Sequence, residues 1–390
     1  MKILFLTTVL PSKKRMGSEV ASQSLIDVLS ALGNEVTVAG YVRTEDIYEL
    51  GSQEVCVGRR PIESKSAGLY PLFWFARSLL RGLPYSIAKY WSRAFTVFVS
   101  NQLRQGRYDL IILDHVQMIW LADHIPHSSK LIGLAHNIEH QMYGSFIGEQ
   151  GSGWRRWVYE RESRLLKKLE MKFANRVDQL WALTKSDANF FSSIKKNGDV
   201  KEIPLPPSSI PSDATLGSKD FDIGMIGSWT WKANEEGLRW FFNSVYPRLS
   251  PSLDIRVAGS GASWLDGRFA NVKYLGFVED AQDFLRRARA VAIPTLSGGG
   301  IQIKTLDAIA SGSKIVATPL AMRGIDDRPS TVAVAEIPEQ FATLLASAIV
   351  ASPGDLSATD AIQWSRLRLH RFQNEVMECI QQVTHSSRSN

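Results

Sequence analysis

The sequence contains few cysteines and no long apolar segment. Its two cysteines, Cys56 and Cys379, lie far apart in a chain of 390 residues, so neither a disulfide framework nor a closely spaced metal site is indicated. We therefore expect a reducing, cytoplasmic compartment. No run of about 18 consecutive apolar residues occurs, and no membrane-spanning helix is expected. The apolar residues 3–10 lack a small-residue cleavage site after them, which favours a first β-strand over a signal peptide.

The sequence also lacks the glycine fingerprint of dinucleotide-binding proteins. Residues 3–10 are predicted to form a buried strand, residues 18–32 a helix and residues 35–39 a second strand, which is a Rossmann-like opening. The loop after the first strand contains one glycine, Gly17, instead of G-x-G-x-x-G, so hydride transfer with a dinucleotide is not indicated. Internal repeats and low-complexity segments are absent as well.

The length of the chain predicts two domains. Four prolines between Ile203 and Pro211, followed by polar residues as far as Lys219, indicate an interdomain linker. A second series of strands and helices then begins at residues 222–226. We predict an α/β fold of two Rossmann-like domains, residues 1–205 and 206–363, with an amphipathic C-terminal helix at about residues 364–385.

A glycine loop in the second half is the most informative stretch. A predicted strand at residues 290–293 precedes three consecutive glycines at 298–300, and a helix follows. Glycines let a backbone approach a ligand closely, and the first turn of a helix offers unpaired N–H groups to an anion. Lys304 adds a cation on an exposed helix start, and Asp307 lies on the same face one turn later. This combination fits a nucleoside diphosphate, whereas a plain strand-to-helix turn is the alternative.

Further residues of the second half are predicted to contact the same ligand. Gly227 and Ser228 follow a strand and are expected under the diphosphate, Lys232 is a candidate second cation, and Gly276 is expected to shape the base pocket. The sequence Asp220-Phe221-Asp222 matches the D-x-D motif of metal-dependent glycosyltransferases. Because it stands between a linker and a strand, we expect no metal there, and the helix start with Lys304 is expected to neutralise the diphosphate instead.

A histidine follows a predicted buried strand in the first half. Residues 130–135 end at His136, where open α/β sheets bind ligands. A loop histidine with Asn137 capping the next helix is the alternative. His115 follows another strand, at residues 108–113, with a weaker motif. Glu139 is either a general base or a partner of the helix dipole, and the latter is favoured.

The glycine loop and the histidine segment resemble glycosyltransferase family 4, whose members have the two-domain GT-B fold. The loop has the form Gly-Gly-Gly-x-x-x-Lys, and residues 136–139 have the form His-Asn-x-Glu. The family usually carries two glutamates eight positions apart, where this chain has Gly299 and Asp307. In that fold the final helix crosses back to the first domain.

The resemblance implies transfer of a sugar from a nucleoside-diphosphate donor, without a further cofactor, to a hydroxyl of a glycan or lipid-linked acceptor in bacterial surface polysaccharide or glycolipid assembly. It implies retention of configuration and contact of His136 with the transferred sugar. The residues implied for the donor are Gly17, Gly227, Ser228, Lys232, Gly276, Gly299, Gly300, Ile301, Lys304 and Asp307. A nucleotide-sugar epimerase or hydrolase of the same fold and a non-catalytic binder of anionic polymers remain as alternatives.

The first half contains a basic and aromatic stretch. The net charge of +6 arises from residues 1–205, and residues 59–107 hold a single acid, Glu63, among these basic residues: Arg59, Arg60, Lys65, Arg77, Arg81, Lys89, Arg93, Arg104 and Arg107. Basic residues alternating with aromatic ones are typical of peripheral membrane contact. We predict reversible binding to the inner face of the cytoplasmic membrane through Trp74, Arg77, Arg81, Lys89, Trp91 and Arg93. Ordinary core packing with solvated charges is the alternative.

Overall fold

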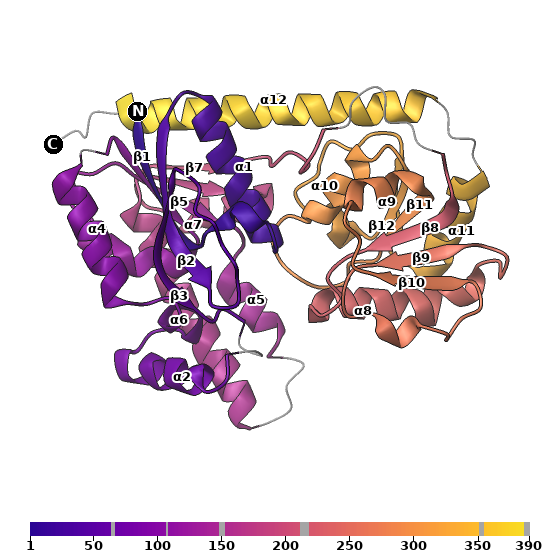
Figure 1. Cartoon of the computed structure of the whole chain (residues 1–390), viewed down its shortest axis with the longest axis horizontal. Helices are drawn as coiled ribbons and strands as arrows, with labels where there is room; N and C mark the ends of the chain where they lie inside the picture. Colours follow the sequence, from indigo (N-terminus) through magenta and orange to yellow (C-terminus); the bar gives the residue numbers. More distant parts are fainter. Residues whose placement is uncertain (64–66, 107, 148–152, 211–217, 351–354, 386–390) are drawn as a thin grey trace. The chain divides into compact units, whose positions relative to one another are not determined.

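A computed structural model describes residues 1–63, 67–106, 108–147, 153–210, 218–350 and 355–385. The chain forms two compact units, each considered by itself below (Figure 1). Unit 1 comprises Met1–Pro204 and the chain from Gln373 onward, and unit 2 comprises Leu205–Phe372. Among the residues described, no helix has the length and apolar character needed to cross a membrane.

Seven parallel strands form the sheet of unit 1, in the order β3-β2-β1-β4-β5-β6-β7. Every residue of β4 and β5 is buried, as expected for strands that are covered on both faces. The bounds of the strands are Lys2–Val9 (β1), Glu35–Arg43 (β2), Glu54–Arg60 (β3), Leu110–Asp114 (β4), Leu131–Ala135 (β5), Gln179–Ala182 (β6) and Asp199–Glu202 (β7).

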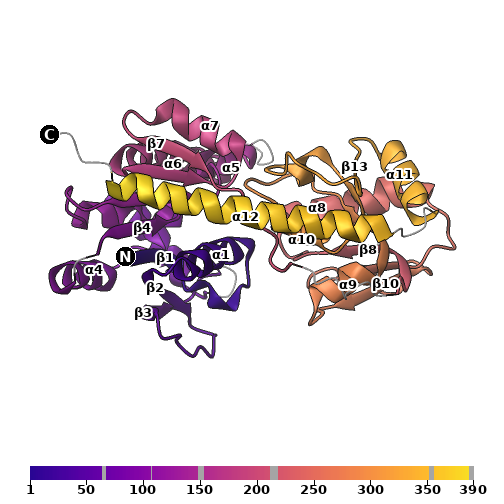
Figure 2. The ribbon, with the colours of Figure 1, turned by 90° about the horizontal axis from the view of Figure 1, so that it is seen from above.

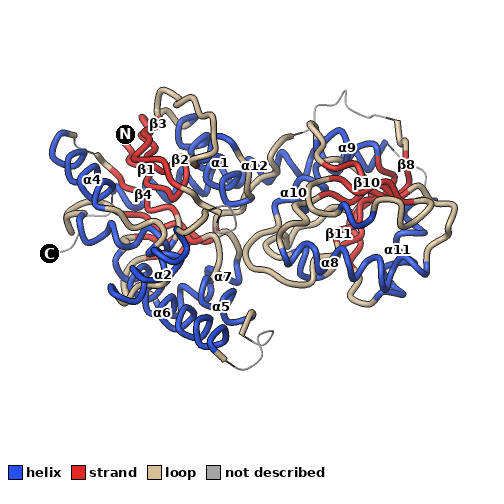
Figure 3. Tube along the Cα trace, turned by 60° about the horizontal axis from the view of Figure 1, so that its bottom comes forward, coloured by secondary structure: helices blue, strands red, loops and turns tan. Residues whose placement is uncertain are grey.

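Helices cover both sides of this sheet (Figure 3). Their bounds are Gly17–Ala31 (α1), Tyr70–Arg81 (α2), Tyr85–Ala88 (α3), Arg93–Gln105 (α4), Glu139–Ser145 (α5), Trp154–Arg176 (α6) and Lys185–Ile194 (α7). The hydroxyl of Thr184 caps α7 by accepting the N–H of Asp187 at 3.1 Å. One core cluster joins Phe95 of α4, Phe173 of α6 and Phe191 of α7 to strand residues such as Leu113.

Unit 2 repeats this architecture with six parallel strands, in the order β10-β9-β8-β11-β12-β13. Helices α8 and α11 lie on one side of the sheet, and α9 and α10 on the other (Figure 3). The bounds are Phe221–Ile226 (β8), Lys232–Trp240 (α8), Ile255–Ala258 (β9), Val272–Gly276 (β10), Ala281–Arg287 (α9), Ala288–Ile293 (β11), Ile303–Ala310 (α10), Lys314–Ala317 (β12), Val332–Val334 (β13) and Pro338–Val350 (α11). The predicted α/β fold class is confirmed.

The last helix, α12 (Asp355–His385), begins earlier than predicted and has residues in both units (Figure 2). Its buried side chains in unit 1 include Val376 and Ile380, and those in unit 2 include Trp364 and Phe372. The predicted linker is only partly a free connection, because Leu205 is buried and its carbonyl accepts the Nε–H of Arg368 at 2.6 Å. The remainder of the predicted linker, residues 211–217, lies outside the described residues.

Each sheet contains one point where the chain reverses its direction of winding. In unit 1 this point lies between the neighbouring strands β1 and β4, and in unit 2 it lies between β8 and β11. The loops at the carboxyl ends of such strands diverge and leave a crevice for ligands. The glycine loop of unit 2 follows β11 at this point. In unit 1 His115 follows β4, and the segment that begins at His136 follows the neighbouring strand β5.

Candidate functional site

The glycine loop of unit 2 connects β11 to α10. Gly298 and Gly300 adopt φ angles of 115° and 68°, in the left-handed region that favours glycine. A side chain at either position would therefore strain the loop. The first N–H groups of α10 have no partner within the helix, so the loop and the helix start can accept an anion, and the binding of a diphosphate there stays a prediction.

Lys304 is enclosed by its neighbours instead of lying on an exposed helix start as predicted. Its side chain is half-buried, and its Nζ donates to Oδ1 of Asn234 on α8 at 2.8 Å. Nδ2 of Asn234 in turn donates to the carbonyl of Ser228 at 2.9 Å. Burial lowers the pKa of Lys304 to about 8. Asn234, which the sequence did not single out, thus joins the predicted cation to the loop after β8.

The loops after β8 and β9 pack backbone against backbone. A Cβ atom at Gly259 would lie 1.9 Å from the carbonyl oxygen of Gly227, so only glycine fits at position 259. The N–H of Gly259 donates to the carbonyl of Gly276 at 2.6 Å, and Gly276 has a φ of 64°. Gly227 and Gly276 therefore lie within one set of contacts, and the contact of either residue with a donor stays a prediction.

Lys232 forms an ion pair with Glu236 at 3.6 Å, one turn along α8. The other carboxylate oxygen of Glu236 accepts the hydroxyl of Ser297 at 2.8 Å, at the start of the glycine loop. Sequence reasoning missed Glu236, because a glutamate on a helix surface gives no sign of a contact 61 positions away. A diphosphate held by Lys232 would compete with this carboxylate.

Both carboxylate oxygens of Asp307 accept hydrogen bonds from Ser208. The backbone N–H of Ser208 lies 2.7 Å from Oδ1, and its hydroxyl lies 3.1 Å from Oδ2. Burial raises the pKa of Asp307, although these hydrogen bonds counteract it. A carboxylate has about four acceptor positions, so Asp307 retains capacity for a sugar hydroxyl, and that role stays a prediction. Ile301 is half-buried in the loop.

The D-x-D sequence lies at the opposite end of β8 from Gly227. Asp220 accepts from Arg287 at 2.6 Å, and Asp222 lies 3.6 Å from Arg289. Both acids are therefore held in ion pairs away from the carboxyl ends of the strands.

His136 of unit 1 lies in a compact group with Asp114, the last residue of β4, and His115, which follows it. Its Nε2 lies 2.7 Å from Oδ1 of Asp114, and its ring stacks on that of His115 with the centroids 3.9 Å apart. The other oxygen of Asp114 accepts the hydroxyls of Thr7 and Ser22 at 2.6 and 2.7 Å. Burial raises the pKa of Asp114, but His115, His136 and these hydrogen bonds together lower it to about 2.

The charge on Asp114 determines how His136 acts. An ionised carboxylate accepts the Nε2–H of the imidazole, so Nδ1 of the neutral ring remains the proton acceptor. Burial lowers the pKa of His115 to about 3 despite the nearby Asp114, and its φ of 74° is unusual outside glycine. Ligand-type atoms of the three residues lie within 4.8 Å of one another. Nε2 of His136 already forms a hydrogen bond with Oδ1 of Asp114, so a metal ion held by these atoms would have to displace that bond.

Helix α5 begins directly after this group. Glu139 is buried on its first turn, and burial raises the pKa of this carboxyl to about 7, although a hydrogen bond from Gln117 counteracts it. The predicted alternative for Asn137 is wrong, because Ile138 precedes the helix and no side chain caps it. Buried Oδ1 of Asn137 and Oε1 of Gln117 have no partner among the described residues, which is unusual away from a ligand or water.

The predicted membrane-facing residues do not all face outward. Trp74 is only 2% exposed, so its prediction is wrong. Residues 74 and 78 both lie on the inner face of α2, one turn apart. Nζ of Lys89 lies 5.7 Å from the ring centroid of Trp74, and burial lowers the pKa of Lys89 to about 8. Arg77 donates to the carbonyl of Trp91 at 2.8 Å, and Trp91 packs against the core cluster.

Other residues of this stretch do face solvent. Arg81 and Arg93 are exposed, and Arg81 lies over the ring of Trp91 at 3.7 Å. Lys65 and Arg107 lie outside the described residues. Helix α2 and the residue before it expose an apolar face, formed by Leu69, Tyr70, Leu72, Phe73, Leu79 and Leu80.

Gly17 begins α1 in unit 1, after the loop that follows β1. It is exposed, and its contact with a donor stays a prediction.

Comparison with known proteins relates this chain to glycosyltransferases. Residues 220–350, which carry the glycine loop, match the family model described as Glycosyl transferases group 1. A protein of Klebsiella pneumoniae, described as an uncharacterized 44.6 kDa protein in the cps region, is 22% identical over 347 residues, which are 83% of this chain and 84% of that protein.

Solved structures resemble the whole chain. Sucrose-phosphate synthase from Thermosynechococcus elongatus has a TM-score of 0.67 at 14% identity and covers 98% of both chains. WaaG, a glycosyltransferase involved in lipopolysaccharide biosynthesis, has a TM-score of 0.62 at 14% identity, over 98% of this chain and 100% of that chain. HepE from Anabaena in complex with UDP has a TM-score of 0.62 at 16% identity, with the same coverage. These likenesses show the GT-B fold.

Proposed function

We propose that this chain, a glycosyltransferase of the GT-B fold with a Glycosyl transferases group 1 domain at residues 220–350, transfers a sugar from a nucleoside-diphosphate donor to a hydroxyl of a glycan or lipid-linked acceptor. The observation that carries the proposal is the cation of Lys304 beside a two-glycine turn at a helix start. This group lies at the carboxyl end of β11, where a sheet of this topology binds its ligand.

The donor diphosphate is held in unit 2. The N–H groups at the start of α10 and the ammonium of Lys304 face the two phosphates, which leave with negative charge when the sugar is transferred. Asp307 accepts a ribose or sugar hydroxyl beside its bonds from Ser208. The complex of HepE with UDP, a protein of the same fold, supports a uridine nucleotide as the first donor to test.

The transfer exchanges one bond at the anomeric carbon of the sugar. The bond from this carbon to the phosphate oxygen breaks, and a bond to the acceptor oxygen forms on the same face, so that the configuration is retained. The leaving phosphate takes the proton of the acceptor hydroxyl. The proton acceptor Nδ1 of His136, oriented by Asp114, binds a hydroxyl of the transferred sugar and stabilises the charge that develops in the transition state.

Two measurements test this proposal. A nucleotide at 100 times its dissociation constant adds about 2.7 kcal/mol to the free energy of unfolding, so a thermal shift with UDP, GDP and ADP identifies the base. Nuclear magnetic resonance of the product then gives the anomeric configuration. An inverted product would assign Asp114 and His136 as the general base and would overturn retention.

The same measurements distinguish the alternatives. An epimerase or hydrolase would convert the nucleotide sugar rapidly without any acceptor. A non-catalytic binder of anionic polymers would show no thermal shift with any of the three nucleotides. The relative from the cps region and the likeness to WaaG support surface polysaccharide or lipopolysaccharide assembly as the process.

We also propose that unit 1 binds reversibly to the inner face of the cytoplasmic membrane. The exposed apolar face of α2 supports this proposal, whereas Trp74 is buried and Lys89 and Trp91 are half-buried. Apolar side chains of an interfacial helix enter the headgroup region, and basic residues beside them attract anionic lipids. Exposed Arg81 and Arg93 supply that charge.

A further inference from the structure

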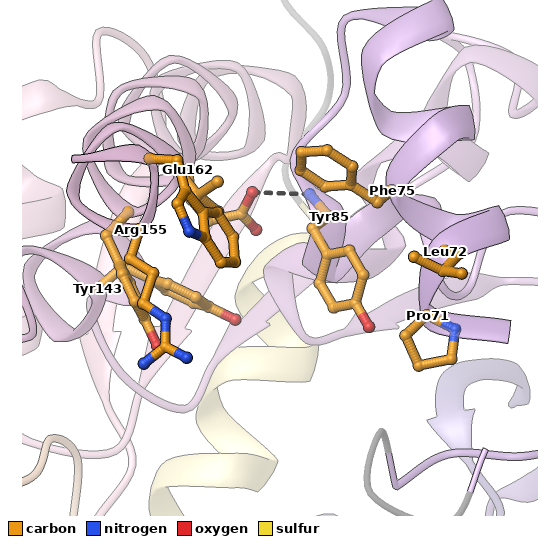
Figure 4. Close-up of a pocket in the computed structure, with 10 residues that line it drawn as sticks. Pro71, Leu72, Phe75, Tyr85, Tyr143, Arg155 and Glu162 are labelled. Carbon is orange, nitrogen blue, oxygen red and sulfur yellow. Dashed lines mark hydrogen bonds between the residues drawn. The ribbon is translucent and has the colours of Figure 1, made fainter. Parts of the chain in front are cut away.

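Unit 1 contains a cavity of about 710 Å³ between α2, α3, α5 and α6. Its walls are mainly aromatic and aliphatic, and the donor-binding residues proposed above do not line it. Phe75, Tyr85 and Leu72 form one wall, and Tyr143 and Arg155 lie opposite them (Figure 4). This volume lies within the range of sites that bind small molecules.

The cavity is held open by hydrogen bonds that require no ligand. The carboxylate of Glu162 on α6 accepts the N–H of Tyr85 at 2.7 Å and the N–H and hydroxyl of Ser86 at 2.9 and 2.8 Å. Arg161, its neighbour, donates to the hydroxyl and the carbonyl of Ser78 on α2, both at 2.9 Å. Helices α2 and α3 are thereby fixed against α6, and a ligand meets a preformed space.

The lining favours a hydrocarbon over a sugar. Three protein donors already bind the carboxylate of Glu162, and the hydroxyl of Tyr143 shares a hydrogen bond with Ser86. A sugar would leave its many hydroxyls without partners against the rings of Phe75 and Tyr159, which is costly. A hydrocarbon loses nothing by leaving water for such walls.

The mouth of the cavity suits an amphiphile with a negative charge. Leu72 is 69% exposed and Trp154 is 72% exposed, and both residues line the cavity, so apolar surface continues from the interior to the exposed face of α2. Arg155 also lines the cavity and is exposed. Its guanidinium is a partner for a phosphate at the end of a chain that lies inside.

Helix α5 connects the cavity to the group around His136. Glu139 on its first turn lies close enough to His136 for their charges to interact, and Tyr143, four residues later, lines the cavity. Four residues of an α-helix span roughly 6 Å. Helix α5 therefore contributes both to the wall of the cavity and to the surroundings of His136.

We propose that this cavity binds the hydrocarbon chain of a lipid-phosphate acceptor, with the phosphate at Arg155. The assignment of the chain as an acceptor rests on the proposed function, whereas the binding of an anionic amphiphile does not. The cavity thus selects acceptors that carry a hydrocarbon chain. This selection is independent of the proposed contact between the α2 face and the membrane.

The first experiment measures binding of dodecyl phosphate, below its micelle concentration, to the full chain by calorimetry. Burial of a methylene group should tighten binding about fourfold, so octyl, decyl and dodecyl phosphate should form a rising series, and inorganic phosphate alone should bind far more weakly. Val158→Trp fills the cavity and should weaken the binding of dodecyl phosphate at least tenfold. Leu80→Ser removes an apolar side chain that is 88% exposed on α2 and does not line the cavity, so it should leave binding unchanged.

A second variant guards against misfolding of the first. Leu72→Glu changes an exposed residue at the mouth and opposes the phosphate, so it too should weaken binding without lowering the unfolding temperature. Equal affinity for the three chain lengths, or unchanged binding by both Val158→Trp and Leu72→Glu, would overturn the proposal. Binding of the protein to vesicles without binding of dodecyl phosphate would also overturn the proposal. The apolar surface would then contact the membrane alone.

A transfer assay then separates this proposal from the proposed function. Val158→Trp should raise the KM for an acceptor that carries a lipid chain and leave transfer to the same acceptor without the chain unchanged. Absence of transfer to every acceptor would contradict the proposed function, while the calorimetric series would still decide the cavity. Equal KM values in Val158→Trp and the wild type would contradict the acceptor assignment.

Discussion

Lys304 is the residue on which the donor site depends most. Replacement by Met keeps much of its apolar packing and removes the charge, so the fold should persist because the lost bond to Asn234 lies at the edge of the loop. The affinity for the nucleoside diphosphate should fall by about 1.5–3 kcal/mol, the usual value of a charge-assisted hydrogen bond. Calorimetric titration with UDP measures it, and unchanged affinity would remove Lys304 from the donor site.

The same residue predicts a pH dependence of donor binding. Burial lowers the pKa of Lys304 to about 8, so the ammonium of the free enzyme is present below that pH and is lost above it. UDP affinity should therefore fall as the pH rises from 7 to 9. Lys304→Arg keeps its charge over this range, so its affinity should stay flat, and parallel profiles for the two proteins would contradict the assignment.

Asp114 should control turnover without controlling donor binding. Asp114→Asn keeps the size of the side chain but no longer fixes the Nε2–H tautomer of His136. We expect turnover to fall about 10²–10³-fold, as for loss of a hydrogen bond that stabilises the transition state, with the KM for the donor little changed. His136→Ala should give a loss of the same order. Steady-state kinetics of both variants test this expectation. Thermal unfolding checks that the altered hydrogen bonds from Thr7 and Ser22 to residue 114 do not destabilise the fold.

The sequence located the motifs but not the partners of their residues. Lys304, Asp307 and His136 stand at recognisable positions in short patterns. Asn234, Ser208 and Asp114, which hold them, lie between 22 and 99 positions away, and only the fold brings such pairs together. The left-handed backbone conformation of His115 likewise could not be predicted from the residues next to it in the sequence.

Helix α5 carries a buried carboxyl next to the group around His136, and its protonation affects stability. Burial raises the pKa of Glu139 from 4.5 to about 7, so the folded state retains a proton that the unfolded state loses between these values. The stability that the protonated carboxyl of Glu139 provides is therefore fully present below pH 4.5 and is lost as the pH rises through 7. Glu139→Gln should gain stability relative to the wild type between pH 5 and pH 8, by at most about 3 kcal/mol.

Urea denaturation of both proteins at the two pH values measures this difference. Glu170, whose pKa burial also raises to about 7, is present in both proteins and cancels in the comparison. A constant difference between the proteins would show that the carboxyl of Glu139 is ionised at neutral pH in the folded state.

Most strands were predictable, because parallel strands that are buried on both faces read as short apolar runs. The edge strands β3, β7 and β13 were not predicted, since β3 and β7 carry charged residues and are only partly buried, and β13 has three residues. Helix α2 shows where this reasoning ended. Its aromatic and aliphatic residues cover most of its circumference, so composition alone did not distinguish the buried Trp74 from the exposed Phe73. The helical period places them on different faces only when the helix bounds are known.

The whole molecule consists of two Rossmann-like units with the same type of parallel sheet. The two units differ in net charge. The basic excess belongs to residues 1–205, but part of it serves internal contacts. Arg60 donates to the carbonyl of Lys89 at 2.7 Å, and Arg43, itself buried, forms ion pairs with buried Glu19 and half-exposed Glu63. The charge available to a membrane is thus smaller than composition indicated, and the exposed apolar face of α2 must contribute more.

Membrane binding should therefore respond to both salt and apolar surface. Each basic residue near an anionic leaflet adds about 1 kcal/mol, so the double variant Arg81→Glu and Arg93→Glu should weaken co-sedimentation with anionic vesicles more than 10-fold. Leu79→Ser with Leu80→Ser should weaken it as well, and high salt should rescue neither variant. Arg104→Glu, on the last turn of α4, serves as a control for reversal of one basic charge outside the proposed contact, to be compared with Arg81→Glu alone. Equal binding of the wild type to neutral and anionic vesicles, or binding to neither, would contradict the proposal, because the exposed arginines would then contribute nothing to the contact.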